Sequence, residues 1–144
     1  MSSDFLASYG GQTTDQLIEL DQRYRIDSIV LAFEQGIQQA AEKRPLTQEE
    51  SYVLAVEALE REVNNGGYSQ FFSNSSSEWA DTIAAALRAI GCPKTADISA
   101  KAVASREDEK ALSECDERYY ANDEPIADRL FDWIKRNRAQ VKLG

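Results

Sequence analysis

The chain has 144 residues, of which 42% are apolar and 28% charged, so it is long enough for one domain and too apolar for wholesale disorder. Its 25 acidic and 16 basic side chains give a formal net charge of −9. That balance argues against direct binding to nucleic acid, which depends on Lys and Arg, and it suits a basic partner.

The chain begins with a polar segment and then becomes helical. Residues 1–13 contain glycine and few apolar side chains, and we expect a flexible amino-terminal segment ahead of a single helical domain over 14–144. Apolar residues recur at three-to-four spacing from 14 to about 43. Their phase shifts near Arg25, so this stretch is either one bent helix or two helices with a break at 27–28.

The next predicted helix has clearer ends. Thr47 and Glu50 have the spacing of a capping box, in which each side chain accepts the other's free backbone N–H. The apolar face of this helix runs to Val63, and the Asn-Asn-Gly-Gly run at 64–67 ends it. Three aromatic residues at i, i+3 and i+4 within 68–72 predict a short further turn of helix pointing inward.

Four more helical segments complete the predicted fold. They are an apolar stripe over 79–90, an alanine-rich segment over 94–105, a highly charged segment over 107–121, and a last helix from about Asp123 with Pro125 in its first turn. No part of the sequence has the alternation of a strand. The expected fold class is all-α, a compact single-domain bundle of about five to seven helices.

The sequence offers little for catalysis or metal binding. It contains no histidine and only two cysteines, Cys92 and Cys115, so we expect no zinc site, no other metal site and no cofactor. Each cysteine is interpreted as a small buried apolar residue. Nucleotide-binding and hydrolase motifs are absent, so we predict that the protein is not an enzyme. Carboxylate pairs at helical spacing keep one alternative open, an enzyme with a carboxylate and asparagine site near 64–70.

No targeting feature is visible in the sequence. Residues 1–11 lack a basic region followed by an apolar run, and no apolar stretch approaches the roughly 18 residues of a membrane helix. We therefore expect a cytoplasmic protein that does not enter a membrane.

The densest local pattern lies between residues 62 and 74. It comprises Glu62, Asn64, Asn65, Gly66, Gly67, Tyr68, Gln70, Phe71, Phe72 and Asn74. Two glycines let the backbone reverse, amide side chains satisfy turn groups, and aromatic rings seal the turn, so the favoured interpretation is a structural helix–turn–helix corner. A polar ligand pocket formed by Asn64, Asn65 and Gln70 is the alternative.

The run from Leu59 to Asn74 resembles the signature E-x-V-N-N-G-G-aromatic-x-Q-aromatic-F of a bacterial domain family of unknown function, whose best-known member is an acidic DNA-mimic protein. The resemblance covers about residues 15–140. It implies an all-α fold and a protein that occupies the DNA-binding surface of a protein partner. The motif itself marks the fold more than the function.

Acidic residues are concentrated after residue 106. The stretch 107–132 has ten acids against three bases, a net charge of −7. The ten predicted partner-binding residues are Glu107, Asp108, Glu109, Glu114, Asp116, Glu117, Asp123, Glu124, Asp128 and Asp132. Rows of carboxylates on helices approximate the charge density of duplex DNA coarsely. A solvated face that serves solubility is the alternative interpretation.

Three functions follow from these patterns. The first is a DNA mimic that occupies the DNA-binding surface of a regulatory or nucleoid protein. The second is an immunity-type inhibitor of a basic toxin such as a nuclease, and the third is the carboxylate enzyme. The sequence also leaves open a homodimer formed through Phe5 and Tyr9.

Overall fold

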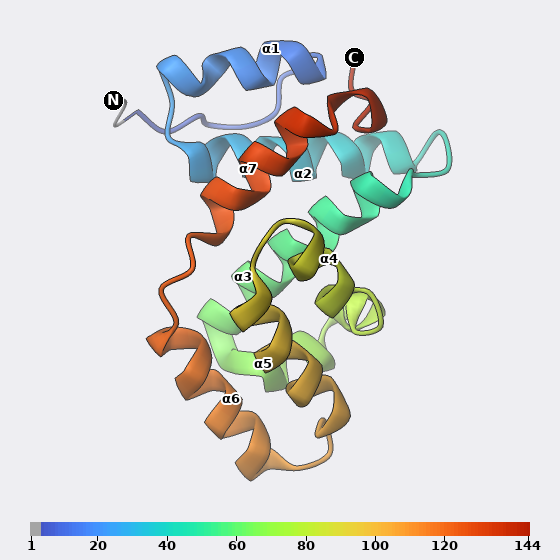
Figure 1. Cartoon of the computed structure of the whole chain (residues 1–144). Helices are drawn as coiled ribbons and strands as arrows, with labels where there is room; N and C mark the ends of the chain where they lie inside the picture. Colours follow the sequence, from blue (N-terminus) through green and yellow to red (C-terminus); the bar gives the residue numbers. More distant parts are fainter. Residues whose placement is uncertain (1–3) are drawn as a thin grey trace. The chain divides into compact units, whose positions relative to one another are not determined.

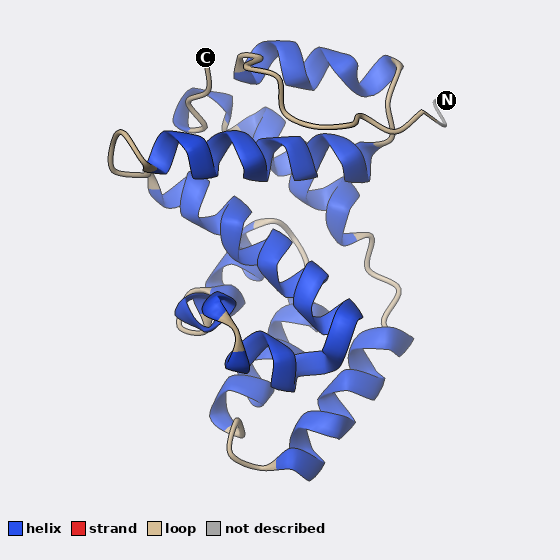
Figure 2. Cartoon of the chain, turned by 180° about the vertical axis from the view of Figure 1, so that it is seen from behind, coloured by secondary structure: helices blue, strands red, loops and turns tan. Residues whose placement is uncertain are grey.

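The computed structural model describes residues 4–144, apart from the side chains at positions 75 and 76. Over that range the backbone forms helices and loops without a named strand, and its one isolated β-bridge pairs Asp4 with Tyr24 (Figures 1 and 2). The α-helices of the described residues are α1 (Thr14–Glu19), α2 (Ile26–Ala41), α3 (Gln48–Ser73), α4 (Ile83–Ala89), α5 (Pro93–Ala104), α6 (Glu109–Ala121) and α7 (Ile126–Arg136). The all-α prediction with five to seven helices is confirmed.

The chain divides into two compact units, which we describe separately. Unit 1 combines the residues up to Leu54 with Ile126–Gly144, and unit 2 is Ala55–Pro125. The boundary falls within α3 and again just before α7. Within the described residues, no helix is both long enough and apolar enough to cross a membrane.

Unit 1 packs α1 and α7 against α2. Its core is apolar and includes Leu17, Ile29, Phe33, Leu130 and Ile134, each at most 2% exposed. The stretch predicted from 14 to 43 forms two helices, the second of the two alternatives. They are separated by a short 3-10 helix and by residues 23–25, so the break lies slightly before the predicted position.

The segment before α1 makes several hydrogen bonds to the start and middle of α2. The N–H of Leu6 donates to the Ser28 hydroxyl at 3.0 Å, and the N–H of Tyr9 donates to the Gln35 side chain at 2.7 Å. Phe5 stays 54% exposed, beneath the guanidinium of Arg25. The flexibility of residues 1–13 and the homodimer stay predictions, and residues 1–3 lie outside the described residues.

The predicted capping box at the start of α3 is confirmed, and its glutamate has further partners. The N–H of Thr47 donates to the Glu50 carboxylate at 2.9 Å, and the N–H of Glu50 donates to the Thr47 hydroxyl at 3.1 Å. Arg44 adds two hydrogen bonds of 2.9 and 2.8 Å, and the N–H of Lys142 adds one of 2.9 Å. Glu50 is 0% exposed, so one buried carboxylate ties the start of α3 to the preceding loop and to residues after α7.

Unit 2 contains the rest of α3 together with α4, α5 and α6, with α5 packed against both α4 and α6 (Figure 1). The stripe predicted over 79–90 is α-helical only from Ile83, because residues 75–79 form a 3-10 helix and a turn separates the two.

The last helix begins at Ile126 and leaves Pro125 outside, contrary to the prediction of a start near Asp123. The preceding residue, Glu124, instead caps α5, as described below.

Replacing Glu50 with Gln tests the buried carboxylate. Burial by itself would raise the pKa of Glu50, but the hydrogen bonds from Arg44, Thr47 and Lys142 lower it from the ordinary 4.5 to about 2. This contribution to the free energy of unfolding is therefore complete above about pH 4.5 and is lost as pH falls toward about 2.

We expect Glu50→Gln to lower the free energy of unfolding at pH 7 by about 3 kcal/mol, because Arg44 loses its charged partner. Urea titration at pH 7 and pH 3 measures this, with a smaller difference between variant and parent at pH 3. Glu49→Gln removes the same charge from the same turn and should cost less than about 1 kcal/mol. Equal losses in the two variants would contradict the assignment.

Candidate functional site

The corner, defined as residues 62–74, interrupts α3 at its two glycines. Gly66 has φ −161° and Gly67 has φ +76° with ψ −175°, so the chain turns here between two helical stretches. A side chain at Gly67 would be strained by its backbone angle, and its Cβ would lie 2.4 Å from a carboxylate oxygen of Asp116. The sequence prediction of a glycine-based helix–turn–helix corner is confirmed.

A single glutamate holds the two arms of the corner together. The Glu62 carboxylate accepts one hydrogen bond from the Gln70 amide and one from the Asn74 amide, both at 2.8 Å. These bonds, led by that from Gln70, lower the pKa of Glu62. Asn64 donates to the backbone carbonyl of Glu60 at 2.6 Å, and Asn65 is exposed. Gln70 and Asn64 therefore satisfy the turn, which favours the structural interpretation over a ligand pocket.

The corner also fixes the position of α6. Just after Gly67, the backbone N–H of Tyr68 donates to the Asp116 carboxylate of α6 at 2.8 Å. The Tyr68 ring meets the Tyr119 ring edge-on at 6.1 Å, and both residues are buried. This pairing ties the turn directly to the middle of the acidic helix.

Two tyrosine hydroxyls of α6 reach α3, one just before the corner and one at its start. Tyr119 donates to the Glu60 carboxylate, and Tyr120 donates to the backbone carbonyl of Val63. Burial raises the pKa of Glu60, which the Tyr119 hydroxyl faces. The sequence does not reveal these contacts, because a tyrosine among charged residues gives no sign of which carbonyl or carboxylate it meets across the fold.

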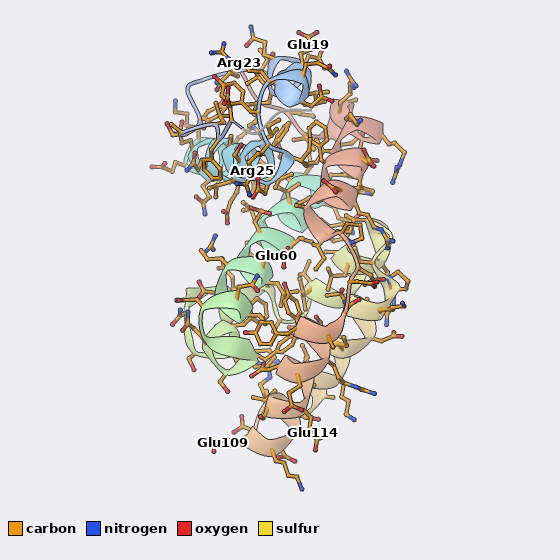
Figure 3. The ribbon with its side chains drawn as sticks, turned by 90° about the vertical axis from the view of Figure 1, so that its left-hand side faces the viewer. Glu19, Arg23, Arg25, Glu60, Glu109 and Glu114 are labelled. Atoms are coloured by element: carbon orange, nitrogen blue, oxygen red, sulfur yellow. The ribbon has the colours of Figure 1, made fainter. Side chains whose placement is uncertain are left out.

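The ten predicted partner-binding acids separate into exposed and internally bonded groups. In unit 2 six are exposed, and we call them the acidic set: Glu107, Asp108, Glu109, Glu114, Glu117 and Asp123. Asp128 and Asp132 are exposed residues of α7 in unit 1, and Asp132 pairs with Lys135 at 3.4 Å. Figure 3 places Glu109 and Glu114 toward the amino-terminal end of α6, away from Glu60.

Asp116 and Glu124 are the two internally bonded acids, because both are half-buried and accept hydrogen bonds across the fold. Asp108 is exposed, but it also caps α6 by accepting the N–H groups of Lys110 and Ala111 at 3.1 and 3.2 Å. Asp116 is half-buried against Gly67 and Tyr68. Glu124 accepts the N–H of Lys94 at 3.1 Å and both the N–H and hydroxyl of Thr95 at 2.7 and 2.6 Å. It thus satisfies free N–H groups at the start of α5. Burial would raise the pKa of Glu124, but these hydrogen bonds lower it overall.

The charge of the protein is concentrated in unit 2. Residues 55–125 hold fourteen acids and seven bases, a net charge of −7, which leaves −2 for unit 1. Both cysteines are buried, as expected for small apolar residues, and burial raises the pKa of Cys115. Among the described residues, no three Cys, Asp or Glu side chains are grouped so that they would hold a metal ion.

A model of the family described as DMP19-like protein matches residues 44–137, about two thirds of the chain. The chain belongs to this family. The match confirms the resemblance to DNA-mimic proteins and includes the whole corner and α4 to α7 of the DMP19-like chain. No curated protein and no solved structure matches the chain.

Replacing Asp116 with Ala tests whether this acid is structural. The buried N–H of Tyr68 would lose its acceptor, and we expect the free energy of unfolding to fall by about 1–3 kcal/mol. Glu117→Ala, an exposed neighbour on α6, should change it by no more than about 0.5 kcal/mol. Thermal and urea unfolding compare the two, and an Asp116→Ala variant as stable as Glu117→Ala would refute the contact.

Gly67→Ala tests the turn itself. The added methyl group meets the Asp116 carboxylate and must adopt a positive φ, so we expect a loss of about 1–3 kcal/mol. Gly91→Ala is a useful comparison, because its φ is +88° but nothing lies within 4 Å of the added Cβ. Unfolding measurements should therefore give a larger loss of unfolding free energy for Gly67→Ala than for Gly91→Ala. Equal losses would mean that backbone strain alone accounts for the effect and that the contact with Asp116 adds nothing.

Proposed function

We propose that this DMP19-like chain is an acidic binding protein that acts as a DNA mimic, occupying the DNA-binding surface of a regulatory or nucleoid protein. In this proposal the exposed carboxylates take the place of phosphates. The acidic set of unit 2 forms the proposed binding surface. Family membership and the concentrated charge support this choice.

The observation that carries the proposal is the combination of exposure and fixed position. The carboxylates of the acidic set lie in solvent on and beside α6, while Asp116, on the same helix, is bonded to the corner. Binding then requires little reordering of the helix, and this lowers the entropic cost of association. Neighbours such as Glu114 and Glu117, three residues apart on one helix, present their charges side by side.

A capture experiment tests the proposal. The immobilised chain is incubated with an extract of the cell that encodes it, and bound proteins are eluted with a short DNA duplex and identified. We expect a DNA-binding protein whose affinity for the chain, measured with both proteins purified, falls roughly ten-fold or more between about 50 and 200 mM salt. Elution by salt alone, with no effect of the duplex, would contradict mimicry.

Matched charge variants place the binding surface. We expect the triple variant Glu114→Gln, Glu117→Gln, Asp123→Asn to bind the purified partner roughly ten-fold more weakly, because each lost surface pair contributes up to about 1 kcal/mol. The control triple Glu19→Gln, Glu42→Gln, Asp81→Asn removes the same charge from exposed positions outside the acidic set. Equal weakening in both would mean that net charge alone is recognised. A captured nuclease that the chain inhibits would favour the immunity-type alternative.

A further inference from the structure

A pocket of about 420 Å³ lies between the carboxyl-terminal end of α3 and the start of α6 in unit 2. Two of its lining residues are apolar: Phe72, which is half-buried, and Leu112, which is buried. Two exposed carboxylates of the acidic set, Glu107 and Glu109, line the same pocket. A pocket that combines an aromatic ring with negative groups has the chemistry to hold a cation that also carries an apolar or planar part.

The Phe72 ring is held in place by two buried aromatic residues. The Phe72 ring packs against Phe71 at 5.4 Å and Tyr68 at 6.3 Å between ring centroids, and both of these neighbours are 0% exposed. The Phe72 ring is therefore fixed to the core of unit 2 and also lines the pocket. The ring itself needs no rearrangement to receive a ligand.

The protein already places a guanidinium on this ring. The guanidinium carbon of Arg106 lies 5.2 Å from the centroid of Phe72, and the Arg106 side chain is exposed. Arg106 is the residue just before the acidic set and lies in a loop. Within the described residues, Glu107 and Glu109 form no ion pair with a Lys or Arg side chain, so both are available to a partner.

We infer that this pocket receives an arginine side chain of the basic partner, an inference that rests on the proposed function. The incoming guanidinium takes the place of Arg106 on the Phe72 ring and pairs with Glu107 and Glu109. Arginine fits better than lysine, because its planar, weakly hydrated group stacks on an aromatic face while it donates in a fork to carboxylates. Arg106 is thus an internal competitor that swings out into solvent when the partner binds.

Fluorescent hexa-arginine and hexa-lysine peptides of equal charge are suitable probes. Binding is measured by fluorescence anisotropy at low salt, and amide resonances in NMR spectra report the place of binding. We expect the parent chain to prefer the arginine peptide roughly five-fold, with the largest resonance shifts at Phe72 and Leu112. Phe72→Leu keeps the charge and should abolish most of that preference while it leaves the affinity for the lysine peptide nearly unchanged.

Two further comparisons keep the test sharp even where Phe72→Leu lowers the melting temperature. Arg106→Gln should raise the affinity for the arginine peptide roughly three-fold more than for the lysine peptide, whereas Lys110→Gln, with the same charge change nearby, raises both equally. The pair Glu107→Gln, Glu109→Gln should lose more arginine preference than the pair Glu42→Gln, Glu78→Gln.

The outcomes separate this inference from the proposed function. A parent chain that binds both peptides equally, or a preference for arginine that survives Phe72→Leu and the Glu107 and Glu109 pair, overturns the arginine pocket and leaves the acidic surface as proposed. A parent chain that binds neither peptide at low salt overturns both.

Discussion

The hydrogen bond from the Tyr68 backbone N–H to the Asp116 carboxylate is the contact on which unit 2 depends. It requires Gly67, because any Cβ there would occupy the space of that carboxylate. The backbone at Gly67 must also adopt a positive φ that other residues rarely take. Removing either partner leaves a polar group without its bond, so the glycine, the amide and the acid act together.

This contact lies in the unit that carries most of the protein's net negative charge. Unit 2 has a net charge of −7, and α6 alone carries Glu109, Glu114, Asp116 and Glu117. Like charges on one helix repel one another and weaken it. The Asp116 carboxylate accepts a hydrogen bond from α3, and the Tyr119 and Tyr120 hydroxyls donate to α3, and these bonds hold α6 against that repulsion. A highly negative helix can then be presented to a partner without loss of order.

The acidic residues of this protein have two different roles: some are hydrogen-bonded within the fold, and others face solvent. Glu50, Glu62 and Glu124 are each held in the fold by several donors, which lower the pKa of all three carboxylates. The acidic set faces solvent, and within it Asp108 also caps α6 through the N–H groups of Lys110 and Ala111. Composition counts both kinds equally, so the net charge of −9 overstates the charge that is free to meet a partner. Substitution at an internally bonded acid changes stability first, and substitution in the acidic set changes binding.

The sequence by itself determined the local features of this protein. The helical periods, the capping box of Thr47 and Glu50 and the glycine corner are set by near neighbours along the chain, and all were predicted correctly. The concentration of acids after residue 106 was equally plain, since charge can be counted without a structure. The predicted helix boundaries are wrong near 79, where a 3-10 helix and a turn precede α4, and near 123, where Glu124 bonds to Lys94 and Thr95.

Only the tertiary structure decided which acids are exposed and which are bonded. Asp116 and Glu117 are adjacent and chemically alike, yet one accepts a backbone N–H from 48 residues away and the other faces solvent. The sequence around Glu124 predicts the start of the last helix. Glu124 instead caps α5, because its carboxylate accepts hydrogen bonds from Lys94 and Thr95 across the fold. The packing between helices determines which distant residues become partners. The local sequence around an acid does not show which residue it will contact across the fold.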